Sequence, residues 1–298
     1  MNNLGDINPL SAGRSIGAIL IDSGKLSLED AERILHVQRE LGLRFGEAAI
    51  QLGLLSSQDI QLALANQYDY PYLLRNEAGS DISEELIAAY QPFSHQVEIL
   101  RALRSQLMLR WFTGEPERRT LAVASPGRGD GRSYLAANLA VVFSQLGEHT
   151  LLIDADLRNP RQHELFNLDN RSGLSSILSN RAELSDIKRV PSFIDLSVLP
   201  AGPQPPNPQE LLGRPMFARL LEELVNEFDV IIIDTPAGAE YADVQTIAVR
   251  ASGALMVARN NQTSVSAFGG LVKAFTHSGV AVVGSVLNDP PRAAKPAA

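Results

Sequence analysis

A glycine-rich turn between an apolar run and a helical pattern constrains this chain more than any other segment. The run Leu121–Ala124 leads into Ser-Pro-Gly-Arg-Gly-Asp-Gly-Arg-Ser at residues 125–133, and a helical pattern follows over Ser133–Leu146. A strand, a glycine-rich loop and a helix in this order are typical of a phosphate-binding loop. Its backbone N–H groups turn inward, and the helix N-terminus favours negative charge. The alternative is an ordinary glycine-rich turn.

The loop also offers a metal ligand. Ser133 lies where a hydroxyl would ligate Mg²⁺. The loop departs from the general pattern at Pro126, which replaces glycine, and at Arg132, which replaces lysine. Arginine keeps the positive charge but presents a planar fork in place of a compact ammonium group. The candidate nucleotide-binding residues of this segment are Gly127, Gly129, Asp130, Gly131, Arg132, Ser133 and Tyr134.

Two aspartates follow the next apolar run, Leu151–Ile153. Asp154 and Asp156 lie two residues apart, so on an extended chain their side chains share one face. Such a pair can hold Mg²⁺ through water, and one member can accept a proton from an attacking hydroxyl. The alternative is a helix cap with a salt bridge to Arg158 or Arg161.

A third aspartate, Asp234, ends the run Val230–Ile233. β-Branched residues that end in an aspartate form a Walker B pattern, in which the carboxylate reaches the metal shell. Three such segments in this order predict one nucleotide site with bound Mg²⁺.

Strand-like and helical patterns alternate from Arg119 onward, which predicts an α/β fold. We expect a P-loop NTPase with a mostly parallel sheet and helices on both faces, preceded by a small, mainly helical N-terminal domain. The predicted domains are a helical repeat at 1–75, a linker at 76–93, the P-loop domain at 94–290 and a loose tail at 291–298.

The first 75 residues contain an internal repeat with an offset of 29 residues, since Gly24, Leu26 and Ser27 recur as Gly53, Leu55 and Ser56. Each copy predicts a short helix, a glycine turn and a second helix. Serine lies at each predicted N-cap, with an aspartate three residues on, as in a capping box.

The net charge and the amino-acid composition exclude several classes of partner and site. The net charge is −8, which argues against nucleic acid as a partner. The chain contains no cysteine, which excludes disulfides and thiolate metal sites. No run is long and apolar enough to span a bilayer, and residues 1–14 lack the features of a signal peptide. We expect a cytoplasmic protein without a membrane segment of its own.

Two smaller features lie at the borders of the P-loop domain. Asn288 follows the last apolar run and could bind a purine edge, or it could be a turn residue before Asp289 and Pro290. Glu98, Arg101 and Arg104 lie three residues apart on a predicted helix, so they share one face. These residues could bind a partner, or they could simply form a charged helix face in contact with solvent.

Together, the segments between Ser94 and Asn288 resemble the bacterial tyrosine kinase family, and most closely its exopolysaccharide chain-length-determinant branch of the EpsG type. The resemblance implies ATP and Mg²⁺ as cofactors and a metal shell of Ser133, Asp154 and Asp234. It also implies Arg132, Asp154 and Asp156 as catalytic residues, with Asp156 as base or metal ligand. In that family the Glu98-x-x-Arg101-x-x-Arg104 helix contacts a neighbouring subunit in a ring oligomer. The partner would be a membrane chain-length determinant (Wzz-like) protein, which brings the kinase to the inner membrane.

The chain departs from that family at Arg132 and in its tail, where no tyrosine follows Tyr241. Family members phosphorylate a C-terminal tyrosine cluster, so another substrate or simple ATP hydrolysis stays open. A non-catalytic sensor and scaffold that binds ATP and cyclic di-GMP is one alternative. A partitioning or cell-division ATPase of the MinD/ParA type is the other, although Gly127 stands where those enzymes carry a lysine.

The N-terminal repeat resembles the MshE N-terminal domain of secretion ATPases, which implies cyclic di-GMP binding. The second copy, from Arg44-Phe45-Gly46 to Gln67, matches that domain better than the first. The alternative is a small helical docking domain. The residues implied in cyclic di-GMP binding are Arg14, Gly17, Gln38, Arg44, Gly46 and Gln67.

Overall fold

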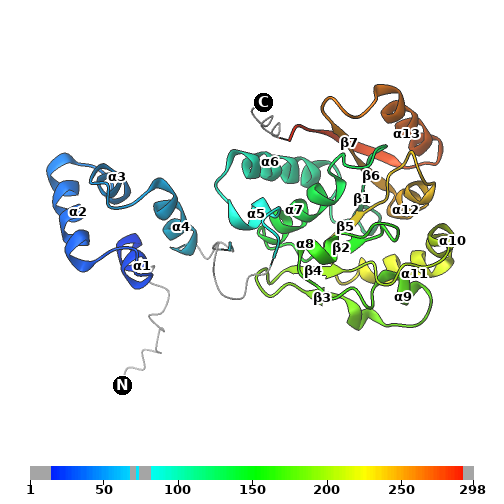
Figure 1. The fold of residues 1–298 in the computed structure, drawn as a ribbon, viewed down its shortest axis with the longest axis horizontal. Coiled ribbons are helices and arrows are strands. Elements are labelled where there is room, and N and C mark those ends of the chain that lie inside the picture. Colours follow the sequence, from blue (N-terminus) through cyan, green and yellow to red (C-terminus); the bar gives the residue numbers. More distant parts are fainter. Residues whose placement is uncertain (1–14, 68–71, 74–81, 291–298) are drawn as a thin grey trace, which may run out of the picture. The chain divides into compact units, whose positions relative to one another are not determined.

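The computed structural model describes residues 15–67, 72–73 and 82–290 of the chain. It divides the chain into two compact units, Met1–Tyr72 and Leu73–Ala298 (Figure 1). The division lies close to the predicted end of the helical domain at residue 75. The predicted tail at 291–298 and the first part of the predicted linker, 76–81, lie outside the described residues.

Unit 1 consists of two helix pairs, as the repeat predicts. The helices are α1 (Ile16–Asp22), α2 (Leu28–Leu41), α3 (Phe45–Gln51) and α4 (Ser57–Gln67). The Ser27 hydroxyl accepts the Asp30 N–H at 3.0 Å, and the Ser56 hydroxyl accepts the Asp59 N–H at 3.1 Å. These bonds satisfy backbone donors that have no partner within the helix, so the repeated serines fix where α2 and α4 begin.

The paired glycines of unit 1 allow close helix packing. A Cβ atom at Gly46 would lie 2.9 Å from the Ile60 side chain, and one at Gly17 would lie 3.3 Å from the ring of Phe45. Packing against neighbouring helices therefore accounts for both glycines.

Unit 2 is built on a seven-stranded sheet with the order β3-β4-β2-β5-β1-β6-β7. All neighbouring strands are parallel except β3 and β4, which are antiparallel. The strands are β1 (Thr120–Ala124), β2 (Thr150–Asp154), β3 (Lys188–Arg189), β4 (Leu196–Leu199), β5 (Val230–Asp234), β6 (Gly253–Arg259) and β7 (Ala281–Asn288). The predicted sheet is confirmed, and β3 is the strand that the sequence pattern did not indicate.

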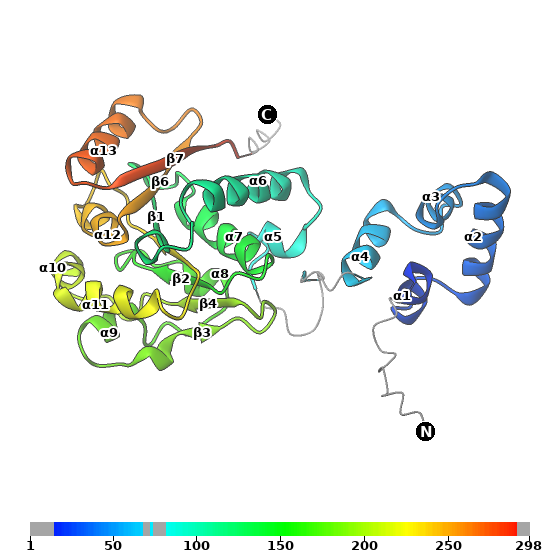
Figure 2. The same cartoon turned by 180° about the vertical axis from the view of Figure 1, so that it is seen from behind.

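Helices cover both faces of this sheet (Figures 1 and 2). Leu121 and Val123 of β1 pack on the same side as α7, whereas Ala122 and Ala124 belong to the core on the other side. This alternation is what a strand buried on both faces requires. The first layer contains α5 (Ile87–Tyr90), α6 (His95–Arg110), α7 (Arg132–Ser144) and α8 (Gln162–Leu165). The second contains α9 (Leu174–Leu178), α10 (Pro208–Gly213), α11 (Pro215–Leu224), α12 (Asp243–Ala251) and α13 (Val265–His277).

Part of the stretch predicted as a linker, 76–93, is a packed element of unit 2. Leu86, Ala88 and Ala89 are fully buried. The buried Asn138 side chain of α7 accepts the Ala88 N–H at 3.0 Å and donates to the Glu85 carbonyl at 3.0 Å. The apolar side chains and these hydrogen bonds attach α5 to α7.

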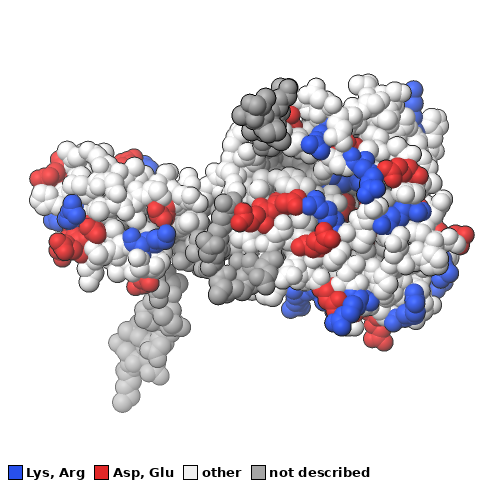
Figure 3. Space-filling model, viewed as in Figure 1, with Lys and Arg blue, Asp and Glu red and all other residues white. Residues whose placement is uncertain are grey.

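No helix in the described ranges combines the length and the apolar character needed to cross a membrane. On the face drawn in Figure 3, the acidic and basic side chains described for unit 2 are interspersed, and they form no continuous basic field there.

Candidate active site

The parallel strands bring the predicted segments together at one edge of the sheet. Asp154 at the end of β2 lies opposite Asp234 at the end of β5, and β5 pairs in turn with β1, which leads into the glycine-rich loop. A pocket of about 450 Å³ opens above this edge. Its lining includes Arg128, Gly129, Gly131, Arg132, Ser133, Tyr134, Asp156, Asn159, Arg161, Pro236, Tyr241, Arg259 and Asn288. Glycine-rich loops at the carboxyl ends of parallel strands are where such folds bind nucleotides.

The side chain of Asp130 stabilises the conformation of the glycine-rich loop through hydrogen bonds. Its carboxylate accepts the Gly127 N–H at 2.8 Å and the Thr263 hydroxyl at 2.7 Å, and its side chain is buried. The side chain predicted to bind nucleotide therefore shapes the loop. Gly131 caps α7 with φ of 102°, a value that few side chains tolerate.

Asn288 closes the loop from the end of β7. Its side-chain amide donates to the Asp130 carbonyl at 3.0 Å. A Cβ atom at Gly131 would lie 2.2 Å from that amide nitrogen, so glycine is required there. Asn288 also lines the pocket, and its role toward a purine stays a prediction.

Arg132 uses its planar fork to tie the loop to the sheet. Nε donates to the Thr235 carbonyl at 2.8 Å, while Nη1 contacts the Ser125 hydroxyl at 2.5 Å and the Gly127 carbonyl at 2.6 Å. A lysine has no such fork, so the substitution changes how the loop is supported as well as how phosphate is contacted. Burial raises the pKa of nearby Asp234, and the positive charge of Arg132 opposes this rise.

The two strand-end carboxylates are fully buried. Asp154 accepts the backbone N–H groups of Arg161 and Gln162, each at 2.9 Å. Burial, followed by the neighbouring charge of Asp234, raises the pKa of Asp154 well above its usual value. Burial also raises the pKa of Asp234 to about 6, against the opposing effects of Arg132, the Ser133 hydroxyl and the Gln162 amide. Two neighbouring carboxylates that are both buried favour the binding of a cation between or beside them, because a positive charge stabilises their ionised forms.

Asp156 is the carboxylate of this group that lines the pocket. It accepts the backbone N–H groups of Arg158 at 3.2 Å and Asn159 at 2.9 Å, which fix its direction. The alternative predicted for these aspartates is a helix cap with a salt bridge to Arg158 or Arg161. Asp154 does accept the N–H groups at the start of α8, as a helix cap would, but the two arginines form their ion pairs with other carboxylates. Arg158 pairs with Asp243 at 2.6 Å and Arg161 pairs with Glu85 at 2.5 Å.

Gln162 is a site residue that the sequence pattern did not reveal. It is fully buried on α8, and its amide nitrogen donates to the Ser133 carbonyl at 3.1 Å and to Asp234 Oδ2 at 2.8 Å. It lies in a four-residue helix after the aspartate pair, where no motif marks it.

The residues present fit a bound Mg²⁺. Ser133, Asp154 and Asp234 supply the hard oxygen donors that this ion prefers. Asp234 Oδ1 is buried and has no hydrogen-bond partner among the described residues. A buried carboxylate oxygen without a donor is costly, and a metal ion or its water would satisfy it.

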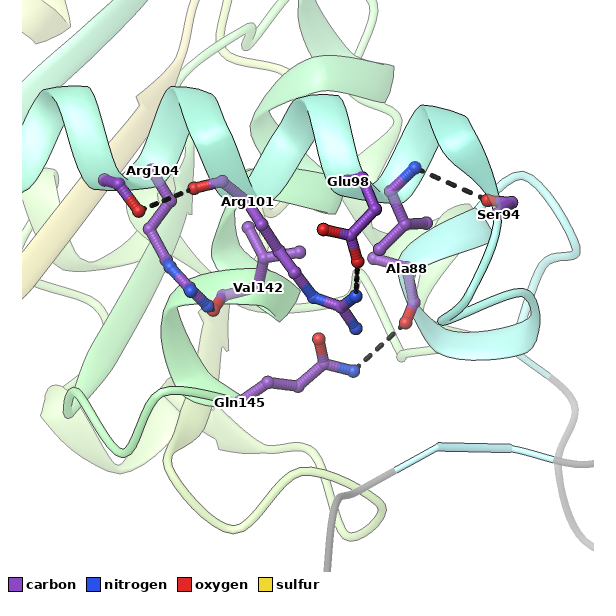
Figure 4. Close-up of polar contacts among 9 residues, drawn as sticks. Ala88, Ser94, Glu98, Arg101, Arg104, Val142 and Gln145 are labelled. Carbon is purple, nitrogen blue, oxygen red and sulfur yellow. Dashed lines mark hydrogen bonds and ion pairs between the residues drawn. The ribbon is translucent and has the colours of Figure 1, made fainter. Parts of the chain in front are cut away.

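The predicted subunit-contact residues of α6 do not all face outward (Figure 4). Glu98 is exposed and pairs with Arg101. Arg104 turns toward α7 and donates to the Val142 carbonyl at 2.6 Å, in the last turn of that helix. Arg104 thus caps α7 within the same chain.

The predicted cyclic di-GMP residues lie in unit 1. Gly17 and Gly46 pack against neighbouring helices, and Gln38 and Gln67 are half-buried on α2 and α4. Arg44 is exposed at the start of α3, and its N–H donates to Glu47 at 2.9 Å. Arg14 lies outside the described residues.

The fold and this site define a P-loop nucleotide-binding protein. A model of the ParA family, described as NUBPL iron-transfer P-loop NTPases, matches residues 117–290. The septum site-determining protein MinD of Pyrococcus horikoshii, in complex with Mg-ADP, has a TM-score of 0.52 at 22% identity. It covers 59% of this chain and 72% of its own, which shows the fold alone.

Closer likenesses are to tyrosine kinases. The putative tyrosine-protein kinase CapB of Staphylococcus aureus is 39% identical over 204 residues, 67% of this chain and 87% of CapB. The kinase domain of Escherichia coli tyrosine kinase ETK has a TM-score of 0.68 at 29% identity, covering 77% of this chain and 89% of its own. The match covers only 28% of the longer tyrosine-protein kinase wzc of Salmonella typhimurium.

The chain therefore belongs to the family of bacterial tyrosine-protein kinases. The predicted fold class, family and enzyme class are confirmed, and the fold implies binding of ATP and Mg²⁺. The partitioning ATPase and the non-catalytic sensor are not favoured.

The raised pKa of Asp234 predicts how the stability of the chain depends on pH. The pKa of this carboxyl is about 6 in the folded chain and 3.8 by its ordinary value. Ionisation therefore opposes folding, and the free energy of unfolding falls as pH rises through this window. In EDTA at pH 7.5, Asp234→Asn should raise the free energy of unfolding by roughly 1–3 kcal/mol. The gain should shrink as pH falls from about 6 to about 4, because the folded state then binds the proton, and it should be lost below about pH 4, where both states bind it.

Urea unfolding followed by the fluorescence of the single tryptophan, Trp111, measures this effect, because that residue is buried in unit 2. Asp229→Asn is the control, since Asp229 is exposed just before the same strand. Equal stability of Asp234→Asn and the unaltered chain at pH 7.5 would contradict the prediction.

Proposed function

We propose that this chain is an ATP- and Mg²⁺-dependent protein-tyrosine kinase that regulates exopolysaccharide chain length, polymerisation and export. Its partner would be a membrane chain-length determinant (Wzz-like) protein, which holds the kinase at the cytoplasmic side of the inner membrane. The catalytic part rests on the position of Asp156. Its carboxylate lines the pocket beside the glycine-rich loop, and a hydrogen bond from the Asn159 N–H fixes its orientation. A putative tyrosine-protein kinase in the cps region of Klebsiella pneumoniae, 31% identical over 255 residues, supports the polymer assignment.

The chemistry follows from the positions of the side chains. Backbone N–H groups of residues 129–133 hold the phosphates at the start of α7. Asp156 accepts the proton of the attacking tyrosine hydroxyl. Ser133, Asp154 and Asp234 would hold Mg²⁺, which neutralises charge on the phosphates. Arg132 keeps the loop in place and adds positive charge beneath it.

The phosphoacceptor is proposed to be a tyrosine of another protein. The hydroxyl of the buried Tyr90 donates to the Ile82 carbonyl at 2.7 Å. Arg158 lies over the ring of Tyr241, 3.8 Å from its centroid. These two of the six tyrosines of the chain are engaged within the chain, which disfavours them as acceptors of a phosphoryl group.

A transfer assay tests the proposal. The chain is incubated with Mg²⁺ and γ-labelled ATP, with and without the cytosolic segment of a membrane chain-length protein. Label on tyrosine is expected, and Asp156→Asn should lower the rate by roughly 10²–10⁴-fold with ATP affinity retained, because it removes the base. Asp154→Ala with Asp156→Ala should abolish transfer.

Asp169→Asn, at an exposed carboxylate outside the pocket, is the matched control and should leave the rate unchanged. If the unaltered chain binds ATP but never transfers phosphate, even with the partner segment, the kinase proposal fails.

A homo-oligomer is also proposed, with α6 at the subunit contact. Glu98 is exposed and pairs with Arg101, whose side chain is largely covered, so Glu98 is the charge that this face offers to a neighbouring chain (Figure 4). Arg104 supports the contact from within by capping α7.

Light scattering coupled to gel filtration measures the oligomer. Glu98→Lys should shift the mass toward the monomer, because it reverses the exposed charge that is proposed to face the neighbouring subunit. Glu115→Lys is the control, as Glu115 forms a similar exposed pair with Arg118, 3.6 Å apart. A monomeric unaltered chain, or an unchanged mass for Glu98→Lys, would contradict the assignment.

Unit 1 is proposed to bind cyclic di-GMP through the repeated segments that contain Gly17, Gln38, Arg44, Gly46 and Gln67, together with Arg14. Two similar helix pairs suit a ligand with two similar halves, and the exposed Arg44 offers a positive charge to a phosphate. The packing role of the glycines is an explanation that needs no ligand, which makes a direct test necessary.

Calorimetric titration of cyclic di-GMP into the whole chain provides this test. Binding is expected, and Arg44→Ala should weaken it by roughly tenfold or more, about 1.4 kcal/mol, because a phosphate contact is lost. Arg33→Ala is the control at an exposed arginine of α2, which pairs with Asp30. The absence of binding by the unaltered chain would leave unit 1 as a docking domain.

A further inference from the structure

The orientation of the Gln162 amide is fixed by its partners. Its nitrogen contacts the Ser133 carbonyl and Asp234 Oδ2, and both of these groups only accept hydrogen bonds. The NH₂ group must therefore face them, and the oxygen Oε1 must point away. Among the described residues Oε1 has no hydrogen-bond partner, although it is buried.

A second buried oxygen without a donor belongs to the side chain next to it. Asp234 Oδ1 has no partner among the described residues either, and the Asp234 carboxylate is hydrogen-bonded to the Gln162 amide through its other oxygen. Two unsatisfied acceptors on touching side chains, both fully buried, share one small region. Each costs free energy unless a donor reaches it.

The donors that fit this region are metal-bound waters. Mg²⁺ keeps several waters when it binds beside nucleotide phosphates, and those waters are strong donors. Asp154 and Asp234 do not line the pocket, whereas Ser133 does. Carboxylates that lie behind the pocket wall would reach the ion most readily through its waters.

We propose that Gln162 is a positioning residue for the Mg²⁺ that binds with the nucleotide. Its Oε1 accepts a hydrogen bond from a water of the ion, and its NH₂ group holds Asp234 so that Oδ1 accepts another. The backbone of Gln162 contributes as well, because its N–H donates to Asp154 at 2.9 Å. One residue thus links both strand-end carboxylates to the first turn of α7. This inference rests on the proposed nucleotide and Mg²⁺ site.

The test is the affinity for ADP, measured by calorimetry with Mg²⁺ and again with EDTA. Gln162→Met keeps the volume of the side chain but removes its donor and acceptor. We expect unchanged affinity in EDTA and a loss of roughly 10–100-fold in the gain that Mg²⁺ provides, as for other residues that orient metal ligands. A Mn²⁺ titration of the ADP complex, followed by electron paramagnetic resonance, should show the same loss.

Gln145→Met is the matched control. Gln145 directly follows α7, at the end opposite to the glycine-rich loop, and its amide donates to the Ala88 carbonyl at 3.0 Å. The Gln145→Met substitution should change neither affinity. Trp111 fluorescence during thermal unfolding in EDTA checks that both variants fold.

The outcomes separate the inference from the proposed function. Equal losses for Gln162→Met with and without Mg²⁺ would mean a purely structural role and overturn the inference, as would no loss at all. If the unaltered chain binds ADP with no gain from Mg²⁺, the proposed metal site fails and the inference fails with it. ADP binding and a Mg²⁺ gain that only Gln162→Met reduces would support it.

Discussion

Two like charges placed side by side in a dry interior are the constraint on which the site depends. Asp154 and Asp234 end neighbouring strands in register, and the Ala155 N–H donates to the Asp234 carbonyl at 3.0 Å, so the sheet holds the two carboxylates together. Burial makes their charges costly. Most of the groups around them are donors or cations: the Arg132 guanidinium, the Ser133 hydroxyl, the Gln162 amide and three backbone N–H groups. The Asp156 carboxylate is the exception, and its charge raises both pKa values further. The charge of this pair therefore accounts for most of the hydrogen-bond donors that surround it.

Much of this arrangement could be predicted from the sequence, because the responsible patterns are local. The run Leu121–Ala124, the glycines after it and the helix that follows specify a strand, a loop and a helix in consecutive residues. Asp154 and Asp234 could be assigned to strand ends, since each directly follows an apolar run. If the strands pair in parallel, their carboxyl ends lie at the same edge of the sheet, so these segments come together there. The repeated serines of unit 1 likewise fixed the helix starts.

The contacts that were missed join residues far apart in sequence. Asp130 reads as a loop residue, and only the fold shows that Thr263 reaches it. Arg104 reads as part of an exposed charged face, yet the packing of α6 on α7 places its guanidinium at the Val142 carbonyl. Gln162 carries no motif because its role depends on where α8 lies relative to two strands. Strand β3, with two residues, is too short for a periodic pattern.

The attachment of α5 to α7 changes where the catalytic unit begins. Asn138 joins the backbone of residues 85 and 88 to the helix that carries the phosphate loop, and Glu85 reaches Arg161 beside the pocket. A fragment cut at Ser94, where the longer helix begins, would expose the buried amide of Asn138 and the apolar wall under Leu86. Limited proteolysis of the natural chain should accordingly yield a core that retains this segment, and any force or partner that peels it away would act directly on the rim of the nucleotide pocket.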